Sequence, residues 1–472
     1  ATSILTASSR PYWNSANNIS VKEHSKMKII ITGAYSIGTY LAKLFAKNKD
    51  NIIIIDSDQE RLEKINNEAD LLTVCASTTN INTLKSNGID EADLYIAVTP
   101  DQSVNINNCI IAHALNAKKT VAKVDDPEFM TDDSREFFRR LGVDNLIYPE
   151  ELAAREIISG LKMSWVRQRW DVHGGALVML GIKLHHNCEI LDQPLKDICG
   201  PDDPYHIVAI KRDADTIIPN GNDTLKYHDL AYFMTTKQYI PYIRRIVGKE
   251  HYVDVKNVMM MGCGNTGERA VKMMPSYMNV KIFESDPHRV EVLNEVLPEK
   301  ALVISADGRD VEELKNENIR DMQAFVALTN NTEVNILSCL TAKQLGVRKT
   351  VAMIDNMAYV GMAEQLSIGT IINKKAIAAS AIYQIMLDTN VMNITYLLSA
   401  NADAAEFVPV EGSKITQHPV KNLKLPKGMT IGGLVREGKG MLVSGNTEIK
   451  PGDSVVVFCH GINLKQVEKL FN

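Results

Sequence analysis

Two glycine-rich turns carry the residue types best suited to chemistry in this chain. They read Gly33-Ala34-Tyr35-Ser36-Ile37-Gly38 and Gly262-Cys263-Gly264-Asn265-Thr266-Gly267, and each follows an apolar run and opens a segment of helical periodicity. In a G-x-G-x-x-G turn the first glycine permits a tight bend, the second lets backbone approach a pyrophosphate, and the third lets helix and strand pack. We therefore predict a dinucleotide diphosphate at the head of each helix, where free N–H groups and the helix dipole favour an anion.

The two turns differ at their middle position. The second turn has Gly264 there, whereas the first has Tyr35. A phenol at this position obstructs the close approach that a glycine allows. We expect the second pocket to bind nucleotide. The first is expected to bind it with a different affinity, to prefer another nucleotide, or to serve as a packing scaffold only.

An acidic residue ends the strand that follows each turn, Asp56 in the first half and Glu284 in the second. A carboxylate at this place accepts hydrogen bonds from a ribose diol and repels a 2′-phosphate, which favours NAD over NADP. Arg61 and Arg289 lie five residues beyond these acids. For each arginine two interpretations remain open, a contact with adenine or phosphate and a surface ion pair.

Further candidate contacts lie in the loops after later strands. They are Ser77, Thr99 and Lys123 in the first half, and Asp307 and Thr329 in the second. Such loops sit at the carboxyl edge of an open α/β sheet, where ligands bind. We assign Ser77 and Asp307 to the adenine side, the threonines to ribose or phosphate, and Lys123 to phosphate. Asn105 and Asn335 are interpreted either as part of this edge or as helix-start residues.

The elements that must position these residues occur twice, because Gly33 and Gly262 lie 229 positions apart and Asn105 and Asn335 lie 230 apart. Apolar runs alternate with amphipathic segments, which predicts parallel strands joined by crossover helices. The expected strands are 28–32, 51–56, 72–74, 94–99, 120–124 and 145–148, then 258–261, 280–284, 301–304, 324–329, 350–354 and 369–372. The predicted fold class is α/β, with two Rossmann-type doubly wound parallel-sheet domains, each followed by a small α+β domain.

The chain is accordingly divided into repeated parts. We predict a disordered tail (1–26), a first Rossmann-type domain with a C-terminal helix (27–170), a first small domain (171–240), a linker (241–254), a second Rossmann-type domain with helix (255–393) and a second small domain (394–472). The long helices, 149–165 and about 373–387, have apolar faces. Each is expected to pack either on its own domain or on a partner.

Composition excludes several classes of function. A formal net charge of −5 argues against a nucleic-acid partner, and no apolar run reaches the ~18 residues of a spanning helix. The seven cysteines are scattered without a C-x-x-C pair, so no metal site is expected. We find no proton donor repeated in both halves beside the glycine turns, which favours a non-enzymatic role. The alternative is an NAD-dependent oxidoreductase with an unidentified substrate.

With these residues in view, the chain resembles the TrkA family, the peripheral subunits of bacterial Trk potassium uptake systems built from tandem regulator-of-potassium-conductance domains. The resemblance rests on the doubled four-part order. It also rests on Gly33, Gly38, Asp56, Thr99 and Asn105 with their counterparts Gly262, Gly267, Glu284, Thr329 and Asn335, and on Asp307. Tyr35 and Ser77 depart from the family's glycine and acid.

The resemblance implies a regulatory protein with no catalysis. It implies binding of NAD⁺ or NADH, with ATP or ADP as further candidates. It also implies a homo-oligomeric ring beneath a membrane-embedded, Trk-type potassium channel subunit, on the cytoplasmic face of the inner membrane. Nucleotide occupancy would then gate the pore through a change in the ring's shape. The two long helices are expected to supply ring contacts.

Overall fold

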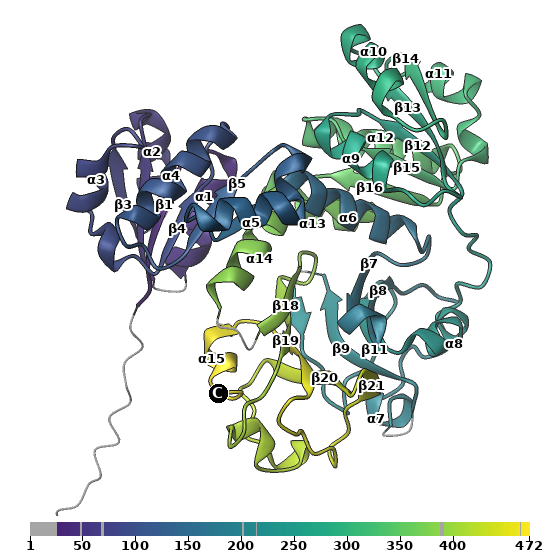
Figure 1. Cartoon of the computed structure of the whole chain (residues 1–472). Coiled ribbons are helices and arrows are strands. Elements are labelled where there is room, and N and C mark those ends of the chain that lie inside the picture. The colour runs from purple at the N-terminus through teal and green to yellow at the C-terminus, as the bar shows by residue number, and fades with distance from the viewer. Residues whose placement is uncertain are drawn as a thin grey trace, which may run out of the picture.

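The computed structural model describes residues 26–47, 50–67, 70–200, 203–213, 215–387, 391–462 and 464–472. The tail that we predicted to be disordered lies outside the described residues, except for its last residue. Four sheets make up the described fold, two parallel and two antiparallel, and they occur in repeating order along the chain (Figure 1). Among the described residues, no helix has the length and apolar character that crossing a membrane requires.

Each Rossmann-type domain is built on a six-stranded parallel sheet with the doubly wound order, confirming the predicted fold class. The first sheet has the order β3-β2-β1-β4-β5-β6, and the second has the equivalent order β14-β13-β12-β15-β16-β17. The first consists of β1 (Lys28–Thr32), β2 (Asn51–Asp56), β3 (Leu72–Cys75), β4 (Leu94–Ala97), β5 (Thr120–Lys123) and β6 (Asn145–Ile147). The second consists of β12 (Asn257–Met261), β13 (Asn279–Glu284), β14 (Ala301–Ser305), β15 (Ala324–Ala327), β16 (Lys349–Met353) and β17 (Thr370–Ile372).

Helices cover both faces of these sheets, because strands such as β2 are apolar on both sides. The first domain has α1 (Ser36–Lys47), α2 (Gln59–Asn66), α3 (Ile81–Ser86), α4 (Gln102–Ala114) and α5 (Asp132–Arg140). The second has α9 (Asn265–Met273), α10 (Pro287–Val296), α11 (Val311–Asn316), α12 (Thr332–Gln344) and α13 (Val360–Gln365). The long helices that follow are α6 (Pro149–Leu161) and α14 (Lys374–Met386).

The two small domains share one antiparallel topology. The first has the strand order β10-β9-β11-β8-β7, and the second has the same order read from the other edge, β18-β19-β22-β20-β21. The first comprises β7 (Gln168–Val172), β8 (Leu177–Lys183), α7 (Leu195–Ile198), β9 (Tyr205–Arg212), β10 (Asp215–Ile217), β11 (Leu230–Thr235) and α8 (Ile240–Ile246). The second comprises β18 (Val391–Leu397), β19 (Ala402–Phe407), β20 (Met429–Arg436), β21 (Lys439–Leu442), β22 (Ser454–Cys459) and α15 (Leu464–Glu468).

Three predicted boundaries shift in the structure. Strand β7 spans residue 170 and β18 spans residue 393, so both small domains begin earlier than the sequence indicated. These strands pair with β8 and β19, which makes them edge strands of the small-domain sheets. Much of the predicted linker 241–254 is helix α8, whose Ile243 and Ile246 are buried in the core of the first small domain.

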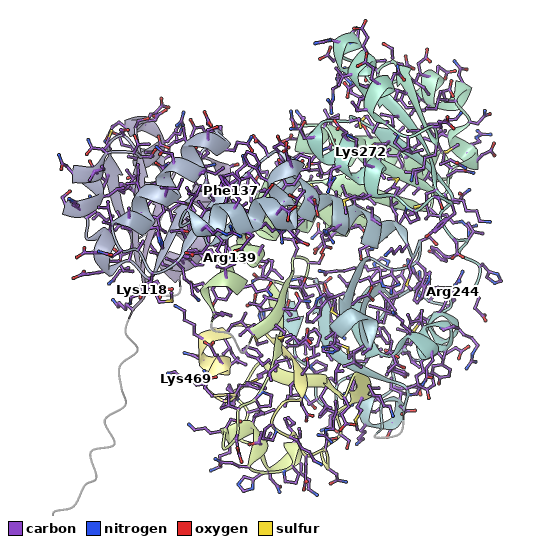
Figure 2. All side chains as sticks on the ribbon, viewed as in Figure 1. Lys118, Phe137, Arg139, Arg244, Lys272 and Lys469 are labelled. Atoms are coloured by element: carbon purple, nitrogen blue, oxygen red, sulfur yellow. The ribbon has the colours of Figure 1, made fainter. Side chains whose placement is uncertain are left out.

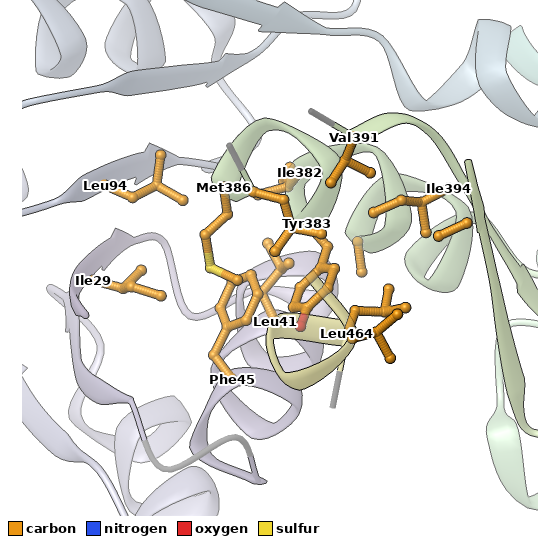
Figure 3. Close-up of a cluster of buried hydrophobic side chains, with 14 of the residues drawn as sticks. Ile29, Leu41, Phe45, Leu94, Ile382, Tyr383, Met386, Val391, Ile394 and Leu464 are labelled. Atoms are coloured by element: carbon orange, nitrogen blue, oxygen red, sulfur yellow. The ribbon is translucent and has the colours of Figure 1, made fainter. Parts of the chain in front are cut away.

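The long helices are exchanged between the two halves of the chain. Helix α6 leaves the first Rossmann-type domain and packs against α9 of the second, burying Ala154 and Ile157 in that domain's core. Helix α14 leaves the second domain and packs against α1 of the first, where Tyr383 stacks on Phe45 at 6.0 Å between ring centroids (Figure 3). The apolar faces of both helices are therefore packed against the opposite half of the same chain.

The exchanged helices also contact each other, and the two small-domain sheets pack together below them. Trp170 of β7 meets Phe458 of β22 edge to face, with the ring centroids 6.4 Å apart. The two halves thus pack against each other as one folded body and are not independent domains joined only by a linker.

Two candidate nucleotide-binding crevices

The second glycine turn has the geometry of an anion-binding loop. Gly262 has a φ of +81°, a conformation that glycine adopts without strain, and its N–H donates to Phe283 O at 2.9 Å. Gly264 is the N-cap of α9, and a β carbon placed on it would meet nothing within 4 Å. Among the described residues, the N–H groups of Gly264, Asn265 and Thr266 have no hydrogen-bond acceptor. Free donors beneath open space are what a phosphate group requires.

The carboxylate of Glu284 holds this turn from the neighbouring strand. Its Oε2 accepts the N–H of Cys263 at 2.9 Å, and its Oε1 accepts the N–H groups of Ser285 and Asp286. The acid at the end of β13 is thus brought to the turn, as its position 22 residues after Gly262 predicts. Its position is that expected of a group facing a ribose diol beside the pyrophosphate.

Arg289 lies against the same turn and is held by protein groups. Its Nε donates to Cys263 O at 3.0 Å, and its Nη2 pairs with Glu268 Oε2 at 2.7 Å. The structure contains the ion pair, one of the two interpretations of this arginine, and a contact with adenine or phosphate stays a prediction. Burial raises the pKa of the Cys263 thiol to about 12, which favours the protonated thiol at neutral pH.

The first turn repeats this backbone arrangement with tighter packing. Gly33 has a φ of +101°, and a β carbon on Gly38 would lie 1.9 Å from Gly33 O. The third glycine therefore allows helix α1 to approach strand β1, as the pattern predicts. Asp56 Oδ2 accepts the N–H of Ala34 at 2.6 Å and so takes the place that Glu284 takes in the second crevice.

Tyr35 is turned toward Arg61 at the rim of the first crevice. The Arg61 guanidinium lies over its ring at 4.0 Å from the centroid, and also pairs with Asp56 and Asp58 at 3.2 Å each. The tyrosine is 37% exposed. The second crevice has Gly264 at the equivalent position, with nothing within 4 Å of an added β carbon, so the two crevices differ where their sequences do.

A buried asparagine fixes the threonine loop at the edge of each crevice. Asn105 Oδ1 accepts from the backbone N–H and hydroxyl of Thr99, and its Nδ2 donates to Thr99 O and Lys123 O. Asn335 makes the same four bonds to Thr329 and Met353 O. Neither asparagine is exposed to solvent. Each asparagine thus fixes the loop by side-chain hydrogen bonds, and we call the two residues the asparagine fasteners. Their equal spacing from Thr99 and Thr329 in the two halves was the sequence signal that could have identified this role.

The remaining candidates lie at the same edge with differing partners. Asp307 forms a two-pronged ion pair with Arg309, with bonds of 2.6 and 3.0 Å, and the hydrogen bond from Arg309 holds its pKa below the usual range. Ser77 bonds the hydroxyl of Thr79 at 3.1 Å. Lys123 contributes its backbone carbonyl to the asparagine fastener. Within the described part of the chain, no cluster of three or more His, Cys, Asp or Glu residues could hold a metal ion.

Comparisons with known proteins agree with this architecture. The TrkA-N domain model matches residues 29–149 and again residues 258–374, and the TrkA-C domain model matches residues 404–472. The Trk system potassium uptake protein TrkA of Azorhizobium caulinodans is 28% identical over 453 residues, which cover 94% of this chain and 98% of that protein. The TrkA homolog 1 of Methanosarcina mazei is 28% identical over 454 residues, covering 94% and 100% of the two chains.

Solved structures show the same fold at lower identity. The RCK domain of GsuK has a TM-score of 0.59 at 13% identity, and the alignment covers 95% of each chain. The GsuK channel bound to NAD has a TM-score of 0.58 at 14% identity, over 95% of this chain and 79% of that one. With the tandem domains matched along most of its length, the chain belongs to the TrkA family of Trk system potassium uptake proteins.

Proposed function

We propose that this chain is the regulatory subunit of a potassium uptake system and that it binds NAD⁺ or NADH in its second crevice. The observation that carries this proposal is the unpaired N–H groups at the head of α9, beneath open space at Gly264 and beside the Glu284 carboxylate. The family membership and the NAD named for the GsuK channel support it. The first crevice, with Tyr35 and Arg61 stacked at its rim, is proposed to bind with different affinity or to prefer ADP or ATP.

Regulation is proposed to work through shape. A ligand shifts a conformational equilibrium only by its differential affinity for the two states. The exchanged helices α6 and α14 connect each Rossmann-type domain to the other half, so a displacement of one domain is passed to both small domains. We propose that such a change is transmitted to a membrane-embedded, Trk-type channel subunit, with this chain in a homo-oligomer on the cytoplasmic face.

Calorimetry on the full chain tests the proposal. NAD⁺ or NADH should bind, and Gly264→Asp should abolish binding at the second crevice, because its carboxylate would stand where the pyrophosphate lies. Failure of every adenine nucleotide to bind would refute it. Steady NADH turnover in a substrate screen would favour an oxidoreductase instead. Nucleotide-dependent co-purification with a Trk-type membrane subunit tests the partner, and loss of that dependence in Gly264→Asp is the expected result.

A further inference from the structure

A cavity of about 440 Å³ lies between the second Rossmann-type domain and the first small domain. Its walls come from the segment after α6, from the end of β8, from residues 249–252, and from the stretch between α12 and β17. These walls include the amino ends of β16 and β17. The cavity is therefore at the opposite edge of the sheet from the glycine turn, which follows the carboxyl end of β12.

The lining of this cavity is strongly basic. Six cationic side chains contribute to it: Arg167, Lys183, Lys249, Lys343, Arg348 and Lys349. The lining contains no aspartate or glutamate. Lys349 and Lys249 are buried, at 2% and 4% exposure. Charges out of contact with water are costly unless they are paired, so such a concentration of one sign calls for an anion.

Neutral protein groups are the hydrogen-bond partners of five of these six side chains. Lys349 Nζ donates to Val166 O at 2.6 Å and to Thr370 Oγ1 at 2.9 Å. Arg167 donates to the carbonyls of Ile368 and Gly369, Lys343 to Ser367 O, Arg348 to His251 O, and Lys249 to the hydroxyl of Tyr252. None of the ion pairs found among the described residues includes any of the six.

At the equivalent edge of the first repeat, a carboxylate neutralises the basic side chain. There Lys118 pairs with Asp93 at 2.7 Å. In the second repeat, 230 residues later, the lysine is replaced by Arg348 and the aspartate by Gln323. Gln323 uses its Oε1 to accept the N–H groups of Lys256 and Asn257. The second repeat therefore has a cation at the same position as the first but no carboxylate opposite it.

We propose that this cavity binds a small anion bearing two or more phosphate groups, and that this anion bridges the second Rossmann-type domain and the first small domain. A cluster of six basic side chains suits an anion with several negative charges, such as a di- or triphosphate, and guanidinium and ammonium groups are the side chains that bind phosphate. The volume lies within the range of small-molecule sites. The proposal is independent of nucleotide binding in the crevices.

The groups facing the cavity give this binding a definite pH dependence. Burial lowers the pKa of Lys349 to about 7 and that of Lys249 to about 8, and Arg167 adds to both effects. Burial lowers the pKa of His185 to about 4, which leaves it neutral. The carboxylates that act on the cluster are Glu364 on Arg167 and Lys183, and Asp229 and Asp213 on Lys183. A phosphate ligand should hold both lysines protonated, so binding takes up protons near pH 7 to 8 and weakens above pH 8.

Calorimetry with inorganic pyrophosphate and tripolyphosphate, on the full chain at physiological salt, tests the proposal. Binding is expected, with proton uptake shown by comparing buffers of different ionisation enthalpy. The double variant Lys343→Gln/Arg348→Gln should weaken binding by roughly tenfold to a hundredfold or more, the size expected for charge-assisted hydrogen bonds. The matched control is Lys118→Gln/Lys119→Gln, which removes two charges at the same edge of the first repeat and should change affinity little. Figure 2 shows Lys118 on the first Rossmann-type domain.

Three results would overturn the proposal. The first is an absence of binding at millimolar probe. The second is an equal loss of affinity in the control variant, which would show that the effect comes from net charge alone and not from the cavity. The third is loss of binding in Gly264→Asp, which would place the probe at the glycine turn. Anionic vesicles of phosphatidylglycerol serve as a competitor. Failure to displace the probe supports a soluble ligand, whereas displacement would assign the cavity to a lipid headgroup and refute the soluble-ligand assignment.

Discussion

Two glycines with opposite surroundings provide a direct test of the proposed nucleotide site, because alanine should damage the fold at one and binding at the other. A β carbon at position 38 would stand 1.9 Å from Gly33 O and 3.2 Å from a methyl of Val98, so the backbone must move. Overpacking of this kind costs about 1–3 kcal/mol, and we expect the upper end because the obstructing atom is a carbonyl oxygen. For a domain of this size the melting temperature should then fall by roughly 5–10 °C.

At position 264 the same methyl group meets nothing within 4 Å. Replacing a glycine N-cap by alanine costs up to about 1 kcal/mol, so Gly264→Ala should melt within roughly 4 °C of the wild type. Its β carbon would nevertheless occupy the space through which the turn approaches a pyrophosphate. If the added methyl group prevents one hydrogen bond between a backbone N–H of the turn and the pyrophosphate, the affinity for NAD should fall roughly tenfold to a hundredfold.

Differential scanning calorimetry and titration calorimetry on the two variants separate these effects. The matched control is Gly361→Ala on α13, where a β carbon is equally unobstructed and the site lies away from both glycine turns. Gly361→Ala should leave the affinity for NAD unchanged. Its melting temperature should rise only slightly, because alanine stabilises a helix more than glycine does. Wild-type NAD affinity in Gly264→Ala, or an unchanged melting temperature in Gly38→Ala, would refute the reasoning.

Three further substitutions test the electrostatics and the fasteners. Glu284→Gln keeps an acceptor for the Cys263 N–H but removes the charge that repels a 2′-phosphate, so the ratio of NADP to NAD affinity should rise; an unchanged ratio in calorimetry would contradict the assignment. Glu151→Gln should lower the free energy of unfolding by about 1–3 kcal/mol, because Glu151 on α6 is 11% exposed and bonds Arg269 on α9 at 2.5 and 3.1 Å. Burial acts to raise the pKa of Glu151, but hydrogen bonds from Arg155 and Arg269 outweigh this effect, so the pKa is lowered in the folded protein. The stabilisation by Glu151 is therefore complete above its ordinary pKa of 4.5 and is lost as the pH falls through the lower pKa of the folded state. Melting experiments in acid should show this loss in the wild type and not in Glu151→Gln. Asn335→Leu should cost about 2–4 kcal/mol, since it leaves the N–H of Thr329 and the carbonyl of Met353 without a partner, and a chemical melt like that of the wild type would exclude the fastening role.

Local patterns in the sequence were sufficient to locate the strands and the turns. A short, continuous apolar run such as 52–55 predicts a strand that is buried on both faces of a parallel sheet. In the structure these residues belong to β2, which is buried in this way. Gly33 and Gly262 adopt positive φ because the chain must reverse between strand and helix. The strands predicted to end at Thr99 and Thr329 stop earlier, at Ala97 and Ala327, because the asparagine fasteners draw the next two residues into a loop.

Long-range partners could not be predicted in the same way. The apolar face of α6 shows that the helix must be buried, but nothing in its periodicity distinguishes its own domain from the other half of the chain. Asn105 has an ordinary local context, and its bond to the carbonyl of Lys123, 18 residues away, becomes evident only with the fold. The basic cavity gathers residues that are far apart in sequence, from Arg167 to Lys349, so no motif marks it.

The exchange of helices gives a physical reason for duplicating the unit within one chain. Arg269 belongs to α9, the helix whose first turn forms the second crevice, and it pairs with Glu151 on α6. Helix α6 leads directly into β7 of the first small domain, whose Trp170 contacts Phe458 of the second. On the other side, Tyr383 on α14 stacks on Phe45 of α1, the helix of the first crevice. A displacement at either glycine turn is therefore resisted by the opposite half, so occupancy of one crevice should alter the affinity of the other, and by linkage the effect must be reciprocal.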